Sequence, residues 1–382
     1  MKDCHNIEDL RRLAERRLPR IFFDYVDGGS NSELTRAANE SDFARWRLRQ
    51  HVLRDVSGRD LSTSFLGAGH ALPLMLGPLG FLGMCGRRGE VAAARAAGRA
   101  GVPSCISAFA IRPIDEVTRE NPDVTIYSQL YVLQDRALTE VLIARAEAAG
   151  AKALFLTVDT AVTPARERDV RNGFRNLTRP TLRQWANMLS RPSWCRDVIR
   201  DGMPEVGHAR AAGFGRGVME QAGNLARQID PALTWADVDW LRRRWPGKLV
   251  IKGILEPEDA RRAVDAGADG IVVSNHGGRQ LDGASSTIMA LPAIAEAVGA
   301  GLDVLVDGGF RRGWHIALAL ALGASAVSIG RPYAWGLAAG GEAGVARAIA
   351  LLAGELDSTL ALMGLRSVAA LRAAGRSAVH FN

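Results

Sequence analysis

The sequence lacks the features that identify disulfide-rich, metal-binding, membrane-spanning and secreted proteins. Its 382 residues contain only four cysteines, widely spaced, with neither a CxxC motif nor the Cys/His spacing of a metal site. We therefore expect isolated reduced thiols and no metal. The longest apolar run, Ile316–Ile329, is too short to span a bilayer and is predicted to be a buried helix followed by a strand. Charges throughout Met1–Ser30 argue against a secretory signal.

Common nucleotide-binding and nucleic-acid-binding motifs are also missing. There is no P-loop, no GxGxxG fingerprint and no HExxH, so a Walker-type ATP site, a Rossmann-bound dinucleotide and a zinc protease site are not expected. The net charge of +7 would suit nucleic acid, an anionic membrane or an anionic substrate. Because basic residues are not interleaved with aromatic ones and no zinc finger or RNP-type motif is present, we expect no nucleic acid partner.

What the sequence does contain is one repeated pattern beyond residue 70. A short apolar run ends in a polar residue or glycine, and an Ala/Arg-rich helical stretch follows. Such runs are typical of parallel strands buried on both faces, and eight in series predict a (β/α)8 TIM barrel. The runs are Pro73–Gly77, Pro103–Ser107, Thr125–Gln129, Ala153–Asp159, Lys248–Lys252, Gly270–Ser274, Asp303–Asp307 and Ala326–Gly330. The helical stretches include Gly89–Gly101, Arg136–Ala149, Pro257–Ala266, Thr287–Val298 and Trp314–Leu322.

Two parts of the chain fall outside this pattern. Residues 1–70 are predicted to be a helical lead-in, in which Asn6 caps a helix at Ile7–Arg17 and Pro19 opens a second helix that ends at Gly28-Gly29. Residues 71–382 are predicted to be the barrel. Its fourth and fifth runs are separated by far more chain than the others, which predicts an insertion at about 171–235.

In a TIM barrel the catalytic side chains gather at the carboxyl ends of the strands, so the ends of the runs form a ring. The first half of the ring is neutral and polar, and the second half is cationic. Glycines beside the last two cations let backbone N–H groups approach a phosphate. The first half contains Pro78, Leu79, Gly80, Ser107, Gln129, Tyr131, Thr157 and Asp159; the second contains Lys252, His276, Arg279, Arg311 and Arg331, with Asp307, Gly308, Gly309 and Gly330.

This asymmetry predicts two anionic ligands. One is a phosphate near the seventh and eighth strands, and the other lies beside His276 and Arg279, since arginine holds a carboxylate bidentately. His276 with Asp159 as its partner is a plausible general base. Flavin mononucleotide (FMN) suits the first anion site, with its ring held by Ser107, Gln129 and Thr157.

The segment Ser274–Asp282, SNHGGRQLD, resembles the signature of the FMN-dependent 2-hydroxy acid dehydrogenase and oxidase family, which includes glycolate oxidase, L-lactate dehydrogenase and (S)-mandelate dehydrogenase. The resemblance implies oxidation of a small (S)-2-hydroxy acid to the 2-oxo acid. Gly80 stands where the glycolate oxidases have alanine, which favours the lactate and mandelate branch. Six shorter segments extend the resemblance over nearly the whole chain: Asp24-Tyr25, Gln129–Tyr131, Thr157–Asp159, Ile251–Gly253, Asp307–Gly313 and Ile329–Arg331.

The resemblance also implies roles for single residues. His276 would take a proton from the substrate, oriented by Asp159. Arg279 and Arg166 would hold the carboxylate with help from the phenol of Tyr25, and Tyr131 would hydrogen-bond near the reacting oxygen. Lys252 would lie at the pyrimidine edge of the flavin. The remaining expected cofactor residues are Pro78, Leu79, Gly80, Ser107, Gln129, Thr157, Ser274, Asp307, Gly308, Gly309, Arg311, Gly330 and Arg331.

The insertion has its own composition. Between Arg175 and Arg216 it carries eight arginines against three acidic residues, a net charge of +5. The arginines are 175, 179, 183, 191, 196, 200, 210 and 216, and the apolar residues among them are Trp185, Met188, Leu189, Trp194, Val198, Ile199 and Met203. Arginine with tryptophan and aliphatic residues is typical of a segment lying on a membrane, while a mobile lid over the active site is the alternative.

The resemblance and this segment together predict a homotetrameric enzyme on the cytoplasmic face of the cell membrane that passes electrons to a quinone. The alternative is a soluble oxidase that uses oxygen and produces hydrogen peroxide. Two further readings are another FMN barrel enzyme, such as an isomerase, and a non-catalytic barrel. The pair His276 and Arg279 argues against the first, and the presence of the whole set of site residues argues against the second.

Overall fold

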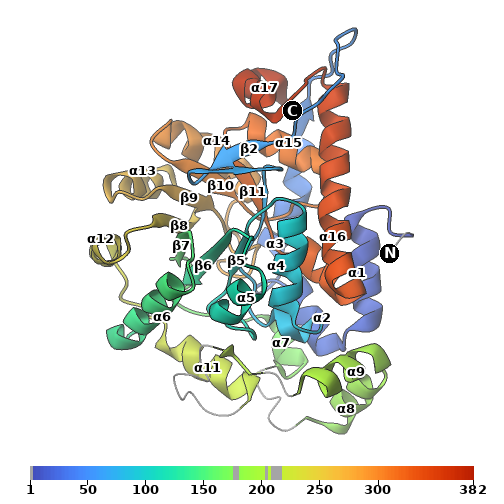
Figure 1. The fold of residues 1–382 in the computed structure, drawn as a ribbon, viewed down its shortest axis with the longest axis vertical. Coiled ribbons are helices and arrows are strands. Elements are labelled where there is room, and N and C mark those ends of the chain that lie inside the picture. The colour runs from blue at the N-terminus through green and yellow to red at the C-terminus, as the bar shows by residue number, and fades with distance from the viewer. Residues whose placement is uncertain (1–2, 175–179, 203–204, 208–216) are drawn as a thin grey trace.

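The computed structural model describes residues 3–174, 180–202, 205–207 and 217–382. Eight parallel strands form a closed barrel in the order β10-β11-β4-β5-β6-β7-β8-β9, which confirms the predicted (β/α)8 fold (Figure 1). Each strand lies in one of the eight predicted runs, and β6 and β8 continue past the predicted ends. The strands are β4 (Leu74–Leu76), β5 (Ser104–Ile106), β6 (Ile126–Leu130), β7 (Ala153–Thr157), β8 (Lys248–Ile254), β9 (Gly270–Val273), β10 (Asp303–Val306) and β11 (Ala326–Ile329).

The barrel is a packed core because alternate strand residues point inward and outward. Met75, Phe155 and Leu305 belong to the inner cluster, which the hairpin of β2 (Thr63–Phe65) and β3 (Ala68–His70) joins through Phe65. The outward residues pack on the surrounding helices. These are α4 (Gly89–Arg99), α5 (Ile114–Glu120), α6 (Arg136–Ala148), α12 (Trp235–Arg244), α13 (Pro257–Asp265), α14 (Thr287–Val298), α15 (Gly313–Ala321) and α16 (Arg331–Leu362).

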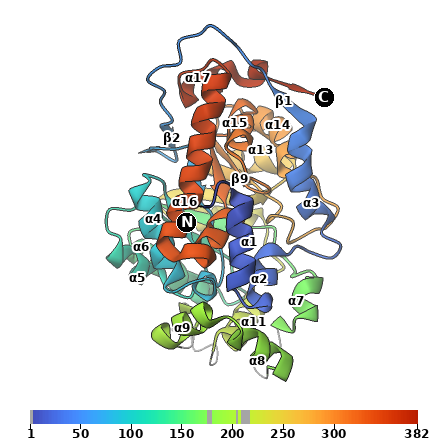
Figure 2. The ribbon, with the colours of Figure 1, turned by 90° about the vertical axis from the view of Figure 1, so that its right-hand side faces the viewer.

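The chain before the barrel is helical up to Arg45, with α1 (Ile7–Arg17), α2 (Arg20–Asp27), α3 (Leu34–Ser41) and the 3-10 turn η1 (Asp42–Arg45), whereas residues 46–70 of the predicted helical lead-in form short strands and loops. Asn6 caps α1, its side-chain oxygen accepting the N–H of Asp9 at 2.9 Å. The helix α1 packs along α16 (Figure 2), and β1 (Trp46–Leu48) pairs with the C-terminal β12 (Val379–Phe381). The first and last parts of the chain therefore lie side by side.

The carboxyl end of α2 is held by a buried charge cluster. The side chain of Asp27 is fully buried and pairs with Arg11 at 2.6 Å, Arg168 at 3.0 Å and Arg36 at 3.5 Å. Burial alone would raise the pKa of Asp27, but its arginine partners outweigh that effect and lower it. Arg168 is thus a structural charge, and it ties the chain after β7 to the lead-in.

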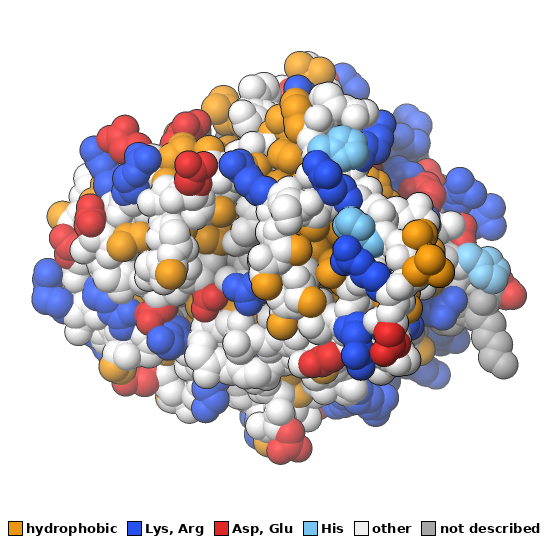
Figure 3. Space-filling model, turned by 90° about the horizontal axis from the view of Figure 1, so that it is seen from above, with side chains coloured by type: hydrophobic (Ala, Val, Ile, Leu, Met, Phe, Trp, Pro, Cys, Tyr) orange, Lys and Arg blue, Asp and Glu red, His pale blue; other side chains and the backbone are white. Residues whose placement is uncertain are grey.

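Between β7 and α12 the chain forms α7 (Glu167–Arg171), α8 (Leu182–Leu189), α9 (Pro192–Asp201) and α11 (Val218–Gln228). These helices lie together at one end of the molecule (Figures 1 and 2). On the opposite end, basic, acidic and apolar side chains are interspersed (Figure 3). The insertion residues Arg175, Arg179, Met203, Arg210 and Arg216 lie outside the described residues. Among the described residues, no helix is both long enough and apolar enough to cross a membrane.

Candidate active site

The carboxyl ends of the barrel strands surround a cavity of about 660 Å³, a size typical of a cofactor or substrate pocket. Almost all of the site residues predicted from the sequence line it, including Tyr25 from the lead-in and Arg166 from the segment after β7. The two exceptions are Asp159 and Ser274, which lie behind lining residues. The predicted residues that line the cavity are Tyr25, Pro78, Leu79, Gly80, Ser107, Gln129, Tyr131, Thr157, Arg166, Lys252, His276, Arg279, Asp307, Gly308, Gly309, Arg311, Gly330 and Arg331.

Asp159 orients the imidazole of His276. The Nδ1 of His276 lies 2.9 Å from Oδ1 of Asp159. Because a carboxylate only accepts hydrogen bonds, this contact places the proton of neutral His276 on Nδ1 and leaves Nε2 free to accept another. Burial lowers the pKa of His276, and the opposing effect of Asp159 does not cancel the shift. The ring is therefore neutral at pH 7, as a general base requires.

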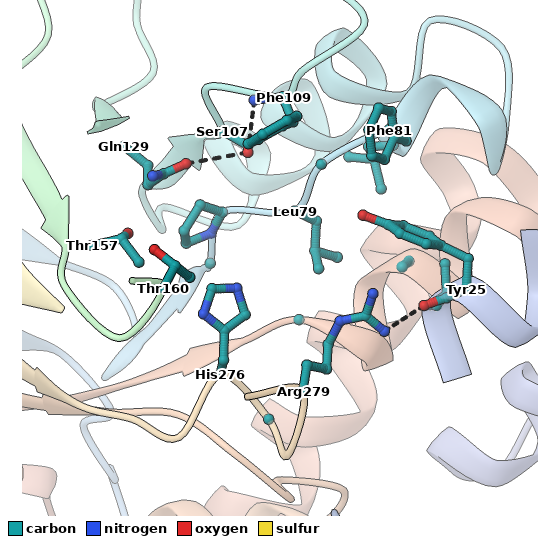
Figure 4. Close-up of a pocket in the computed structure, with 18 of the residues that line it drawn as sticks. Tyr25, Leu79, Phe81, Ser107, Phe109, Gln129, Thr157, Thr160, His276 and Arg279 are labelled. Carbon is teal, nitrogen blue, oxygen red and sulfur yellow. Dashed lines mark hydrogen bonds between the residues drawn. The ribbon is translucent and has the colours of Figure 1, made fainter. Parts of the chain in front are cut away.

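The backbone at His276 is strained. Its φ is 59°, and Gly277 and Gly278 follow at 66° and 74°, so three successive residues adopt the left-handed conformation. This conformation is costly for a non-glycine residue and is concentrated at functional sites. It turns the chain sharply after β9, so that both His276 and Arg279 face the cavity (Figure 4).

Two partly buried cations and a phenol converge on the same part of the cavity. Arg279 donates to the backbone oxygens of Tyr25 and Gly28, and its guanidinium carbon lies 4.7 Å from the centre of the Tyr25 ring. The Nε of Arg166 is buried with no hydrogen-bond partner. Burial and the neighbouring Arg279 lower the pKa of Arg166 to about 10, so it still carries its charge at pH 7. Such an arrangement favours an anionic ligand.

Both tyrosines of the site are neutral at ordinary pH, since burial raises the pKa of Tyr25 and of Tyr131. Each phenol can therefore donate a hydrogen bond. Tyr25 stacks on Phe174, with ring centres 4.6 Å apart, and Tyr131 meets the edge of Phe109 at 5.7 Å. These aromatic contacts fix the direction of each hydroxyl.

A second part of the cavity suits a phosphate. The loop after β10 contains Gly308 and Gly309 with φ of 94° and 79°, and the helix α16 begins beside it at Arg331. A helix N-terminus and glycine backbone N–H groups bind phosphate well. Arg331 donates to the backbone oxygens of Val26, Gly28 and Gly277, which leaves two of its five N–H groups for a ligand.

Between these two parts, several buried polar atoms lack partners within the described chain. They are Nε2 of Gln129, Oγ1 of Thr157 and Oδ1 of Asp307. The side-chain oxygen of Gln129, Oε1, already accepts from the hydroxyl of Ser107 and the N–H of Ala108, which turns Nε2 toward the cavity (Figure 4). This set of donors and acceptors fits the polar edge of a flavin ring.

Lys252 lines the same part of the cavity as these polar atoms. Its Nζ donates to Ser274 at 3.0 Å and lies 3.6 Å from Asp307. Burial acts to lower the pKa of Lys252, but the carboxylates of Asp307 and Asp159 outweigh it and raise the pKa. Lys252 is therefore positively charged, and Ser274 supports it from behind instead of lining the cavity.

At the part of the cavity that suits a phosphate, loss of an arginine should weaken binding of the expected cofactor, FMN. Each charge-assisted hydrogen bond contributes about 1.5–3 kcal/mol, so Arg311→Met should raise the dissociation constant of FMN about 10- to 150-fold. Titration of apoprotein with FMN, followed by flavin fluorescence, measures this. Arg312→Met is the control, because Arg312 pairs with Glu355 instead of lining the cavity. Equal affinities for the two variants would place the phosphate elsewhere.

The sequence did not reveal part of the wall. The helix α11 contributes Ala222 and Gly223, and Phe174 and Thr163 also line the cavity. These residues come from the insertion or from the loop after β7, where no strand end marks a position in the ring. The stacking of Phe174 on Tyr25 depends on tertiary packing and has no signal in the local sequence.

Comparison with known proteins agrees with this geometry. The model of the family "FMN-dependent dehydrogenase" matches residues 14–377. The chain is 49% identical over 365 residues to an L-lactate dehydrogenase of Caulobacter vibrioides, covering 95% of each chain, and 46% identical over 363 residues to one of Xanthomonas campestris, covering 94% of each.

Solved structures give the same picture. The monotopic membrane protein (S)-mandelate dehydrogenase is similar over 100% of both chains, with a TM-score of 0.95 and 37% identity. A mandelate oxidase bound to (S)-4-hydroxymandelic acid has a TM-score of 0.83 and 39% identity, over 97% of this chain and 98% of the oxidase.

Proposed function

The chain belongs to the family of FMN-dependent dehydrogenases, and from this premise we propose how its residues oxidise a 2-hydroxy acid and where the electrons go. It is an FMN-dependent oxidoreductase that converts (S)-2-hydroxy acids to 2-oxo acids. The observation that carries the assignment of roles is the geometry of one cavity: an oriented, neutral imidazole faces it together with two arginines that have donors to spare.

In the proposed mechanism, Arg279 and Arg166 bind the substrate carboxylate, and the phenol of Tyr25 donates a further hydrogen bond to it. This fixes the substrate so that its α-carbon and hydroxyl group lie near Nε2 of His276, which accepts a proton. The imidazolium is then stabilised by Asp159. Tyr131 donates to the oxygen that becomes the carbonyl.

FMN, when bound, takes up the two electrons that leave the substrate carbon. Gln129, Thr157, Ser107 and the backbone at Pro78–Gly80 would hold its ring, and Lys252 would stabilise negative charge at the ring's polar edge. The phosphate would lie on Gly308, Gly309, Gly330, Arg311 and Arg331, with Asp307 beside it.

The experiment that tests the function is anaerobic bleaching of the bound flavin across a panel of 2-hydroxy acids. We expect L-lactate or (S)-mandelate to bleach the yellow protein without oxygen, and the (R)-acids to leave it yellow. A flavin that bleaches with none of the acids would contradict the proposed site.

The substrate side chain is proposed to lie near Gly80. A Cβ added at Gly80 would come within 2.9 Å of Cβ of Phe109 and 3.4 Å of the Tyr25 hydroxyl. Gly80→Ala should therefore narrow the pocket and lower kcat/KM for mandelate more than for lactate, by about 1–3 kcal/mol or about 5- to 150-fold. Steady-state kinetics with both acids measures this. Gly354→Ala is the control, since a Cβ there meets nothing. Equal losses for the two acids would place the side chain elsewhere.

The insertion is proposed to contact the membrane through α8 and α9. Four large apolar side chains are strongly exposed there: Leu182 at 89%, Trp185 at 49%, Leu189 at 68% and Ile199 at 82%. Two residues expected from the sequence to reach a membrane do not. Met188 is buried, and Trp194 stacks on Phe22 at 5.3 Å and donates to the backbone oxygen of Met84.

Trp194 thus anchors α9 to the barrel, while Ile199 on the same helix remains exposed to solvent. Basic residues add attraction to anionic lipid, at about 1 kcal/mol each near the surface. Such a position on the cytoplasmic leaflet would bring the enzyme close to a quinone acceptor.

The membrane proposal predicts flotation of the full chain with anionic liposomes at low salt and weaker flotation at high salt. Leu182→Ser combined with Ile199→Ser should lower the bound fraction without changing substrate-dependent bleaching. Val141→Ser, at an exposed site on α6, is the control. Protein that stays in the aqueous fraction at low salt would favour a lid and an oxygen-using oxidase.

A further inference from the structure

Glu90 is a buried carboxylate that the mechanism does not use. It is the second residue of α4 and is only 2% exposed. A buried carboxylate is normally paired with a cation. Within the described chain, the hydrogen bonds to the Glu90 side chain come instead from backbone N–H groups. Burial raises the pKa of Glu90, and these N–H groups partly oppose the shift.

The N–H groups belong to two different loops. Oε1 accepts from Ile111 at 2.8 Å and from Gly83 at 3.3 Å, and Oε2 accepts from Arg112 at 3.3 Å. Gly83 lies in the loop after β4, whereas Ile111 and Arg112 lie in the loop after β5. The carboxylate therefore joins these two loops at one point.

The same two loops form one wall of the substrate pocket. The first carries Gly80 and the second carries Phe109, and the N–H of Phe81 donates to the backbone oxygen of Phe109 at 3.0 Å. The loops are in very close contact, because a Cβ added at Gly83 would lie 2.8 Å from Cβ of Ile111. A small change in their separation would move Phe109 relative to Gly80.

We propose that Glu90 is a positioning residue for substrate selection: it clamps the loops after β4 and β5 together and so holds Phe109 at the distance from Gly80 that decides which substrate side chains are accepted. The inference rests on the proposed function, which places the substrate side chain beside Gly80. Glu90 itself lies outside the lining of the cavity and acts through Phe109.

The chemistry of the clamp requires a carboxylate. Both of its oxygens accept hydrogen bonds, which matches three converging N–H donors. Glutamine would turn an NH2 group toward N–H groups that now donate to Glu90, and two donors cannot pair with each other. Aspartate keeps the charge but is one methylene shorter. Both substitutions change the loops without removing any atom that touches the substrate.

The first test compares two acids in the FMN-loaded enzyme. Glu90→Gln should lower the ratio of kcat/KM for (S)-mandelate to that for L-lactate by about tenfold, because the larger side chain depends more on Phe109. Glu140→Gln is the matched control, since Glu140 pairs with Arg244 on an outer helix. Flavin content and Tm are measured for each variant, so that general instability is recognised. An unchanged ratio in a folded, flavin-loaded Glu90→Gln would overturn the proposal.

A double-mutant cycle tests whether Glu90 acts through Phe109. If it does, Glu90→Gln should change the mandelate-to-lactate ratio by less than about twofold once Phe109 is already alanine. The same tenfold change in both backgrounds would mean that Glu90 acts by another route, and the proposal would be wrong.

Hydrogen exchange on the unaltered holoenzyme tests the clamp even where a Glu90 variant does not fold. The amides of Gly83, Ile111 and Arg112 should exchange slowly although they lie in loops. Fast exchange at all three would overturn the clamp. A wild-type protein that oxidises neither acid would instead contradict the proposed function, and the exchange result would stand separately.

Discussion

His276→Ala is expected to keep its flavin and to lose turnover by about 10²- to 10⁴-fold, the range of general acid–base catalysis. The reason is that Nε2 of His276 is the neutral acceptor that faces the cavity, held there through Nδ1 by Asp159. Anaerobic rapid mixing, followed by flavin absorbance, measures the loss in the reductive step. His5→Ala at an exposed position is the control.

The pH dependence gives a second check on the same assignment. The base works in its neutral form, so flavin reduction should be flat near pH 7 and should fall as the pH drops through the lowered pKa of His276. Asp159→Asn should move the inflection to still lower pH, because the carboxylate raises the pKa of His276. Near-normal reduction rates in His276→Ala would show that another group removes the proton.

Arg166→Met is expected to lower kcat/KM by roughly 30- to 5,000-fold, since breaking a buried charge pair costs about 2–5 kcal/mol. Most of the loss should appear in KM, because the carboxylate is bound before and during the reaction. The comparison substrate is the corresponding 2-hydroxy amide, which has no negative charge. The wild type should prefer the acid strongly, and the variant should not.

The control for Arg166 lies two residues away. Arg168 pairs with Asp27 and Glu33 and joins α7 to the lead-in, so Arg168→Met should lower Tm but keep the preference for the acid. If Arg166→Met retained that preference, Arg279 alone would account for carboxylate binding.

The strands and the residues at their ends could be predicted because side chains that follow buried parallel strands converge, whatever the loops do. This brought Gln129, Thr157, Lys252 and Asp307 to one cavity. Tyr25 and Arg166 came only from resemblance to the family, since neither follows a strand end. Tyr25 reaches the cavity from the lead-in, and Arg166 reaches it beside Arg279. Both placements depend on contacts between segments that are far apart in the chain.

Other features had no local signal. The left-handed backbone at His276 could not be predicted, because histidine seldom adopts that conformation. It arises from the turn that directs both His276 and Arg279 toward the cavity. The inward packing of Trp194 depends on Phe22, more than 170 residues earlier in the chain. The clamp at Glu90 was missed because its partners are backbone N–H groups, which every residue type except proline supplies.

The lead-in and α16 meet at Arg331, which donates to Val26 and Gly28 across separations of 305 and 303 residues. These contacts determine when the first helices can complete their packing during synthesis of the chain. A chain emerging from the ribosome contains all eight barrel strands before it contains Arg331, and its earliest helices must wait for one of the last segments to be made. Until then, the backbone oxygen of Val26 lacks its guanidinium partner, and the part of the cavity proposed for the phosphate lacks one wall. We therefore expect capture of the cofactor to be a late event, coupled to closure of the two ends of the chain.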